Sequence, residues 1–177
     1  VTNIMATTPA NQTVSVHFED HGCTVKVSVE DSGSGINNLE NAFRLGGVED
    51  KQGPLNEHGF GMKHALASAN PENDNWVVCT RNRENFEAGI YKTVKAPYKI
   101  EGLYAKEIRN EIEPWPGRFN GPGTYLNFTC TREMFNTLRI GMPGQAGFNM
   151  CIQYLIEDLG FLYAGLIERN IATFNIS

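Results

Sequence analysis

The sequence lacks long apolar runs, closely spaced cysteines and an excess of basic charge. No uninterrupted apolar stretch approaches the roughly 18 residues that a membrane-spanning helix needs, so we expect no membrane partner. Lys and Arg number 15 against 20 Asp and Glu, which gives a net charge of −5. Bulk charge therefore does not attract nucleic acid, and we expect nucleic acid to bind only through other domains.

The four cysteines are dispersed, and the two nearest in sequence, Cys130 and Cys151, lie 21 residues apart. This spacing contains no CxxC pair, which excludes a zinc ribbon. Residues 1–10 lack the charged start and apolar core of a signal peptide. These features favour a cytoplasmic protein, or a nuclear one in a eukaryote, whose thiols are reduced and buried.

The chain has the size and composition of one globular domain. It has 177 residues, of which 41% are hydrophobic and 20% are charged, and this length can bury a core without disulfides or metals. The sequence begins with Val1 rather than Met and ends on an apolar, strand-like run at 171–177. We therefore expect residues 1–177 to be a single domain within a longer protein.

Alternating polar and apolar residues predict a β-hairpin of 13–18 and 24–30, joined by the turn signal Asp20-His-Gly22. Further strands are predicted at 76–80, 90–94, 124–130 and 171–177. Helices are predicted at 39–43, after the capping residues Asn37 and Asn38, and within 57–70, where Asn70-Pro71 is a stop signal. A short helix is predicted from the capping residue Thr131 to Leu138. A longer helical region is predicted at 148–166, and Gly160 and Gly165 favour a break in it. These elements predict an α+β fold whose antiparallel or mixed sheet is covered by helices on one face.

Two glycine-rich segments carry the candidate chemistry. Asp31-Ser-Gly-Ser-Gly-Ile36 follows a predicted strand, where a carboxylate can accept a hydrogen bond from an exocyclic amine and glycines let a flat ring approach. Gly59-Phe-Gly-Met-Lys63 precedes a predicted helix, whose bare N–H groups and nearby lysine suit phosphates. An adenine site at one end and a phosphate site at the other together predict a nucleotide pocket.

Each glycine-rich segment taken alone has a plainer interpretation. The first could be a tight turn after a hairpin, the second a close helix-packing start, and Lys63 a solvated surface charge. Neither a GxxxxGK[ST] P-loop nor a GxGxxG dinucleotide motif is present. The order of the two segments, with a polar loop over 48–56 between them, favours the nucleotide pocket.

The pattern resembles the GHKL superfamily of ATPases, which includes gyrase B subunits, ninety-kilodalton heat-shock chaperones, histidine kinases and MutL. The segment at 31–36 is similar to the family's DxGxG adenine box, and the segment at 59–65 is similar to its second glycine box. Gly123-Thr124 is similar to the downstream GT motif. The G-F-G-x-K form looks closest to the MORC-like and MutL-like branches. The resemblance covers nearly the whole chain and implies the two-layer α/β sandwich called the Bergerat fold.

The resemblance implies ATP and Mg²⁺ as cofactors and assigns a role to each matching residue. Asp31 would bind the adenine amine with support from Thr124, and Asn3 would hold Mg²⁺. The other implied contacts are Gly33 and Gly35 beside the ring, Ile36 and Met62 packed near it, and Gly59, Phe60, Gly61, Met62 and Lys63 at the phosphates.

The family's magnesium ligand is the Asn of an E-x-x-x-N helix, and Asn3 stands where that Asn would fall. The alternative is that Asn3 is merely a polar residue of a chain end. The glutamate that positions the attacking water would precede Val1, so no catalytic residue is visible, although Glu57 is a second candidate. Ala6 departs from the family pattern, which often has an Asp at that place.

The leading hypothesis is an ATPase domain in which a lid over 46–58 closes on nucleotide, drives homodimerisation and is reset by slow hydrolysis. An N-terminal helix and a following transducer-like domain would then belong to the longer protein. The alternatives are nucleotide binding without hydrolysis, histidine-kinase-type phosphotransfer, and an interaction module that binds no nucleotide.

Other polar and aromatic side chains are assigned structural roles. Surface or packing roles are predicted for His17 and His21, with metal binding as the alternative. His58 and His64 flank the phosphate loop, and a surface or supporting role is predicted for them, with phosphate contact as the alternative. Local packing rather than a stacking platform is predicted for Trp115, and a solvated strand end for Arg81 and Arg83.

Overall fold

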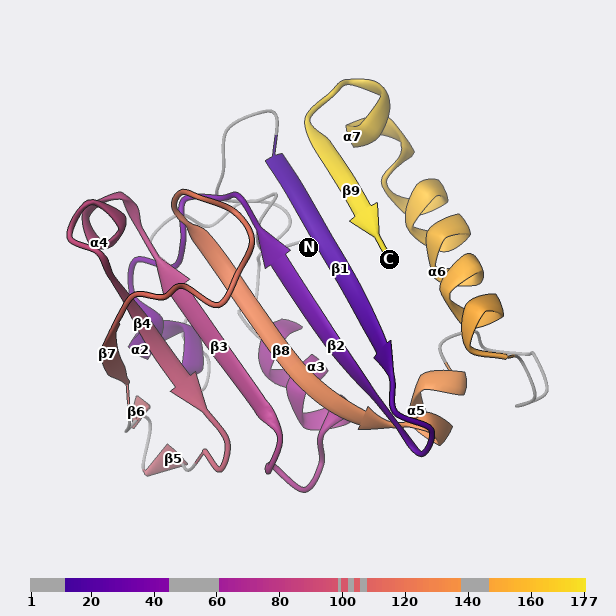
Figure 1. The fold of residues 1–177 in the computed structure, drawn as a ribbon, viewed down its shortest axis with the longest axis horizontal. Helices are drawn as coiled ribbons and strands as arrows, with labels where there is room; N and C mark the ends of the chain where they lie inside the picture. Colours follow the sequence, from indigo (N-terminus) through magenta and orange to yellow (C-terminus); the bar gives the residue numbers. More distant parts are fainter. Residues whose placement is uncertain (1–11, 45–60, 99, 102–103, 106–107, 138–146) are drawn as a thin grey trace.

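The described chain forms one seven-stranded sheet with helices packed against it (Figure 1). The computed structural model describes residues 12–44, 61–98, 100–101, 104–105, 108–137 and 147–177. In sheet order the strands are β7 Arg109–Ile112, β4 Ile90–Lys95, β3 Trp76–Arg81, β8 Gly123–Thr131, β2 Thr24–Asp31, β1 Gln12–Asp20 and β9 Ala172–Ile176. Neighbours are antiparallel except β1 and β9, which are parallel. The predicted α+β class with a mixed, mostly antiparallel sheet is confirmed.

The helices and a small second sheet complete the described elements. The helices are α2 Leu39–Phe43, α3 Gly61–Ala69, α4 Arg83–Glu87, α5 Arg132–Asn136, α6 Phe148–Leu162 and α7 Ala164–Glu168, and the second sheet pairs β5 Ile100–Glu101 with β6 Tyr104–Ala105. The predicted caps are confirmed, because Asn38 accepts from the Asn41 N–H and Thr131 accepts from the Met134 N–H.

The hairpin of β1 and β2 follows from its alternating sequence. Val14, Val16 and Phe18 point to one face and are at most 7% exposed, whereas the residues between them are only half-buried. Gly22 closes the turn with φ of +79°, and its N–H donates to Asp20 Oδ1 at 2.8 Å. The pattern and the turn chemistry therefore specify the same register.

The hydrophobic core lies on one face of the sheet. On β8, Leu126, Phe128 and Cys130 are two residues apart and so point the same way. Leu126 and Phe128 pack against a cluster that contains residues of α2 and α3, and Phe128 and Cys130 belong with a cluster that contains residues of α5 and α6. These four helices therefore cover the same face, and Figure 1 shows α2 and α3 behind the strands. The arrangement is consistent with a two-layer sandwich.

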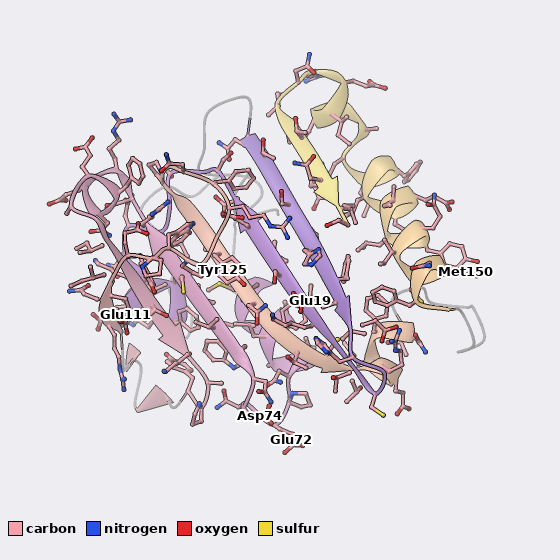
Figure 2. The ribbon with its side chains drawn as sticks, viewed as in Figure 1. Glu19, Glu72, Asp74, Glu111, Tyr125 and Met150 are labelled. Atoms are coloured by element: carbon pink, nitrogen blue, oxygen red, sulfur yellow. The ribbon has the colours of Figure 1, made fainter. Side chains whose placement is uncertain are left out.

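The opposite face is polar, and Figure 2 shows Glu19 and Tyr125 on it. A loop at 113–122 crosses this face and is held by Glu30, which is 4% exposed. The Glu30 carboxylate accepts hydrogen bonds from the backbone N–H groups of Arg118 and Phe119, both at 2.8 Å. Glu30 thus supplies a charged acceptor to each of two backbone N–H groups of this loop.

Arg81 fixes the same loop, which corrects the prediction that it ends a strand in solvent. Its side chain is buried, forms an ion pair with Glu113, and donates to the carbonyls of Gly121 at 2.8 Å and Phe119 at 3.0 Å. The guanidinium also lies 4.3 Å from the centre of the Trp115 ring. These partners satisfy a cation that burial would otherwise penalise. The predicted packing role of Trp115 is confirmed.

Two other local predictions are wrong. The last helical region breaks at Tyr163 rather than at Gly160 or Gly165, because the Tyr163 carbonyl accepts from the first turn of α7 and starts a new helix. Cys23 is exposed, because it lies in the turn between β1 and β2, whereas the other three cysteines are buried.

The short elements α4 and β7 were not predicted, although Asn82 caps α4 by accepting from the Asn85 N–H.

None of the described helices is both long enough and apolar enough to cross a membrane.

Replacing Glu30 with alanine is expected to lower the free energy of unfolding by about 2–4 kcal/mol, because two loop N–H groups lose a charged acceptor. Urea denaturation measures this change. Glu72→Ala serves as the control at an exposed position after α3, and its effect should stay within about 0.5 kcal/mol. Equal effects of the two substitutions would contradict the role given to Glu30.

Candidate functional site

The candidate site centres on Asp31, the last residue of β2. The strand register places Asp31 between Val14 of β1 and Thr124 of β8, and Thr124 lies in turn opposite Thr80 of β3. Because Val14 points into the core, Asp31, Thr124 and Thr80 form one row on the helix-covered face. Asp31 is 4% exposed and Thr80 is fully buried. The sheet therefore brings together a carboxylate and two hydroxyls at the end of the apolar core.

The segment after Asp31 forms a turn that its glycines make possible. The Gly33 N–H donates to Asp31 Oδ1 at 2.7 Å. Gly35 has φ of +73°, and a Cβ there would stand 2.3 Å from the Arg81 carbonyl oxygen. The close approach that Gly35 permits is thus to the backbone of β3, and any side chain at this position would push the turn away from the sheet.

The GT pair is tied to the same turn. A Cβ on Gly123 would stand 2.1 Å from the Asp31 carbonyl oxygen, so only glycine fits there. Thr80 Oγ1 lies 3.2 Å from Thr124 Oγ1 and accepts from the Ile36 N–H at 2.7 Å. Thr80 was missed by sequence reasoning, although a hydroxyl two residues after the buried Val78 was an available signal.

The Asp31 carboxyl titrates far from its ordinary range. Burial raises its pKa from 3.8 to about 6, while hydrogen bonding from the Gly33 backbone and from the hydroxyl and backbone of Thr124 opposes the rise. The carboxylate is therefore largely ionised near pH 7, in a place where ionisation is costly. Such a group is a strong acceptor for an incoming N–H donor.

The second glycine segment is described from Gly61 onward. Gly61 opens α3, is exposed, and has open space where a side chain would project. Lys63 does not extend into solvent, because its ammonium donates to the carbonyls of Ala42 at 2.9 Å and Arg44 at 2.7 Å. Burial lowers the pKa of Lys63. The lysine thus caps the end of α2, a contact that could not be predicted from sequence patterns.

The two glycine segments meet on one apolar cluster. Ile36 from the first and Met62 from the second both pack against the cluster of buried residues that contains Leu39, Phe43 and Leu66. The short helix α2 follows the first segment directly, and Lys63 of the second segment binds its end. The structure therefore places Ile36 and Met62 against one cluster and joins Lys63 to the end of α2.

Several predicted positions lie outside the described residues. These are Asn3, the lid at 46–58, Glu57, His58, Gly59 and Phe60. Among the described histidines, His17 lies 2.9 Å from the Ser177 hydroxyl, and His21 pairs with Glu19 at 3.4 Å. Over the described ranges, no group of three or more His, Cys, Asp or Glu side chains could hold a metal ion.

No protein-family model matches the chain, and no curated protein matches it.

Asp31→Asn is expected to stabilise the fold above pH 6. Because the folded-state pKa is raised, the folded protein binds the proton more tightly than the unfolded chain, and stability falls as pH rises from about 4 to about 6. Asparagine keeps the shape and lacks this cost, so the free energy of unfolding should rise by about 1–3 kcal/mol at pH 7.5 and by little at pH 4.

Urea denaturation at the two pH values measures the difference, with Asp158→Asn on the exposed part of α6 as the control. A loss of stability in Asp31→Asn that is the same at both pH values would contradict this account.

Proposed function

We propose that this chain is a nucleotide-binding domain of GHKL type with a Bergerat fold, which binds ATP with Mg²⁺. The observation that carries the proposal is the buried carboxylate of Asp31 in one row with the Thr124 and Thr80 hydroxyls. A mostly antiparallel sheet with helices on one face is the architecture that the resemblance implies. The shared cluster under Ile36 and Met62 supports the convergence of the two glycine segments.

The chemistry of Asp31 and its neighbours suits the amine and the faces of an adenine ring. A carboxylate whose ionisation is penalised by burial gains most from a donor that arrives with a ligand, and the adenine amine is such a donor. Thr124 supports the carboxylate from β8, and the half-buried side chains of Ile36 and Met62 offer apolar surface for the ring faces. A guanine would direct a carbonyl oxygen at the same carboxylate, which disfavours GTP.

The start of α3 suits phosphates. Bare N–H groups at this helix end attract anions, Gly61 leaves open space, and Lys63 carries a positive charge. Phosphate oxygens are stronger acceptors for an ammonium than the neutral carbonyls of Ala42 and Arg44, so Lys63 would exchange its partners when ATP binds. Gly59 and Phe60 would add backbone contacts.

The bound cofactors would supply a metal-bridged terminal phosphoryl group for transfer to water. Asn3 would hold the magnesium ion. Asp31 and Thr124 bind and orient the base, and Lys63 with the start of α3 orients the phosphates. Lid closure over 46–58 would favour homodimerisation in the full protein, and hydrolysis would reverse it.

Asp31→Asn tests the base site. Loss of the charged acceptor should weaken adenosine and ATP by about 10- to 150-fold, equivalent to about 1.5–3 kcal/mol, as measured by isothermal titration. In the wild-type protein, affinity should fall as pH drops below 6, because the protonated carboxyl is uncharged and accepts a weaker hydrogen bond from the amine. Unchanged affinity in Asp31→Asn, or a pH-independent wild-type affinity between pH 5 and 7, would contradict the assignment.

Lys63→Met tests the phosphate site. The variant keeps the length of the side chain and removes its charge, so ATP should be weakened at least about tenfold while adenosine, which has no phosphate, changes by less than about threefold. Titration with both ligands separates the two effects. Equal weakening of ATP and adenosine would show that Lys63 acts only by holding α2.

A further inference from the structure

Thr80 lies at the meeting point of three segments of the site. Its hydroxyl oxygen is 2.7 Å from the Ile36 nitrogen, 3.2 Å from the Gly123 carbonyl oxygen and 3.2 Å from Thr124 Oγ1. Ile36 belongs to the turn after β2, and the Gly123-Thr124 pair opens β8. No motif of the sequence singles out this residue, and it is fully buried.

The chemistry of the groups around Thr80 limits the directions that its hydrogen bonds can take. A backbone N–H can only donate, so Thr80 Oγ1 accepts from Ile36, and an ionised carboxylate can only accept, so Thr124 donates to Asp31. The Thr80 hydroxyl has one proton and two acceptors at 3.2 Å, the Gly123 carbonyl oxygen and Thr124 Oγ1, whose lone pair is available to it. When that proton is directed at Thr124, four groups form one chain from the Ile36 N–H through Thr80 and Thr124 to Asp31, in which each bond polarises the next.

A hydroxyl at this place is not explained by packing. Val78, two residues before Thr80 on β3, and its partner Val94 on β4 point to the same face of the sheet as Thr80, and each is at most 1% exposed. Valine has the shape of threonine, favours strands and carries no polar group to satisfy. The hydrogen bonds of the hydroxyl therefore explain why threonine, and not valine, stands at this position.

From this geometry we infer that Thr80 is a positioning residue of the site, whose hydroxyl holds the Gly33–Ile36 turn against β8 and directs the Thr124 hydroxyl at the Asp31 carboxylate. The inference rests on the proposed function, since it gives Thr80 a role in binding the adenine base. Thr80 does not touch the ligand in this account and acts through Thr124 and the turn.

The test compares Thr80→Val with Thr80→Ser. Thr80→Val removes the hydroxyl and keeps the shape, so adenosine affinity should fall about tenfold or more, and the Asp31 titration midpoint should move to higher pH by about 0.5 or more. Thr80→Ser keeps the hydroxyl and should restore both values to within about threefold and about 0.2 of wild type. Isothermal titration gives the affinity, and carboxyl ¹³C NMR gives the midpoint.

Thr93→Val is the matched control. Thr93 is 7% exposed on the adjacent strand β4, and its hydroxyl lies 3.5 Å from the Cys79 sulfur rather than near the site. This variant should leave both the affinity and the Asp31 midpoint unchanged. If Thr80→Val does not fold, Thr80→Ala removes the same hydroxyl and is measured in its place.

The outcomes separate this inference from the proposed function. If the wild-type protein binds neither adenosine nor ATP, the proposed function fails. The hydrogen-bond chain is then still supported if the Asp31 titration midpoint is raised in Thr80→Val and returns to the wild-type value in Thr80→Ser. If wild-type protein binds adenosine, and Thr80→Val matches it in both affinity and Asp31 midpoint, the inference is overturned. It is also overturned if Thr80→Ser behaves like Thr80→Val.

Discussion

The burial of an ionisable carboxylate at the end of β2 is the constraint on which the site depends. Asp31 can remain ionised beside the apolar core only because its neighbours donate hydrogen bonds to it, and these neighbours come from its own turn and from β8. Gly35 lets the turn approach the backbone of β3, and Gly123 lets the start of β8 approach the backbone of Asp31. The raised pKa shows that the compensation is incomplete. A donor supplied by a ligand would complete it, which is the physical basis of the proposed nucleotide site.

The adjacent residue, Glu30, shows how the same sheet treats a carboxylate with a structural role. Glu30 and Asp31 are equally buried but point to opposite faces, as neighbours on a strand must. Each Glu30 oxygen accepts from a backbone N–H of the 113–122 loop, and Arg81 holds the same loop from β3. Since that loop leads into Gly123-Thr124, the polar face fixes the strand end that supports Asp31 on the helix-covered face.

Local signals in the sequence predicted much of the fold. Alternation gave the β1–β2 hairpin, and the capping residues Asn38 and Thr131 gave the starts of α2 and α5, because these features depend on residues a few positions apart. For the site, the sequence predicted Asp31 and the two glycine segments. It did not predict the partners of Lys63 and Arg81 or the part played by Thr80, because these depend on strand order and on contacts between residues 19 to 44 positions apart. The break at Tyr163 was missed because glycine was taken as the only signal.

The central claim is that the row of Asp31, Thr124 and Thr80 binds the base of ATP. The most direct measurement is a ¹⁵N NMR titration of the protein with ATP and Mg²⁺, followed by the same titration with GTP. The account predicts that ATP shifts the backbone amide signals of Gly33, Ile36 and Thr124, and that GTP leaves them in place at the same concentration. Amide shifts confined to other parts of the chain, or equal shifts at these residues with both nucleotides, would contradict it.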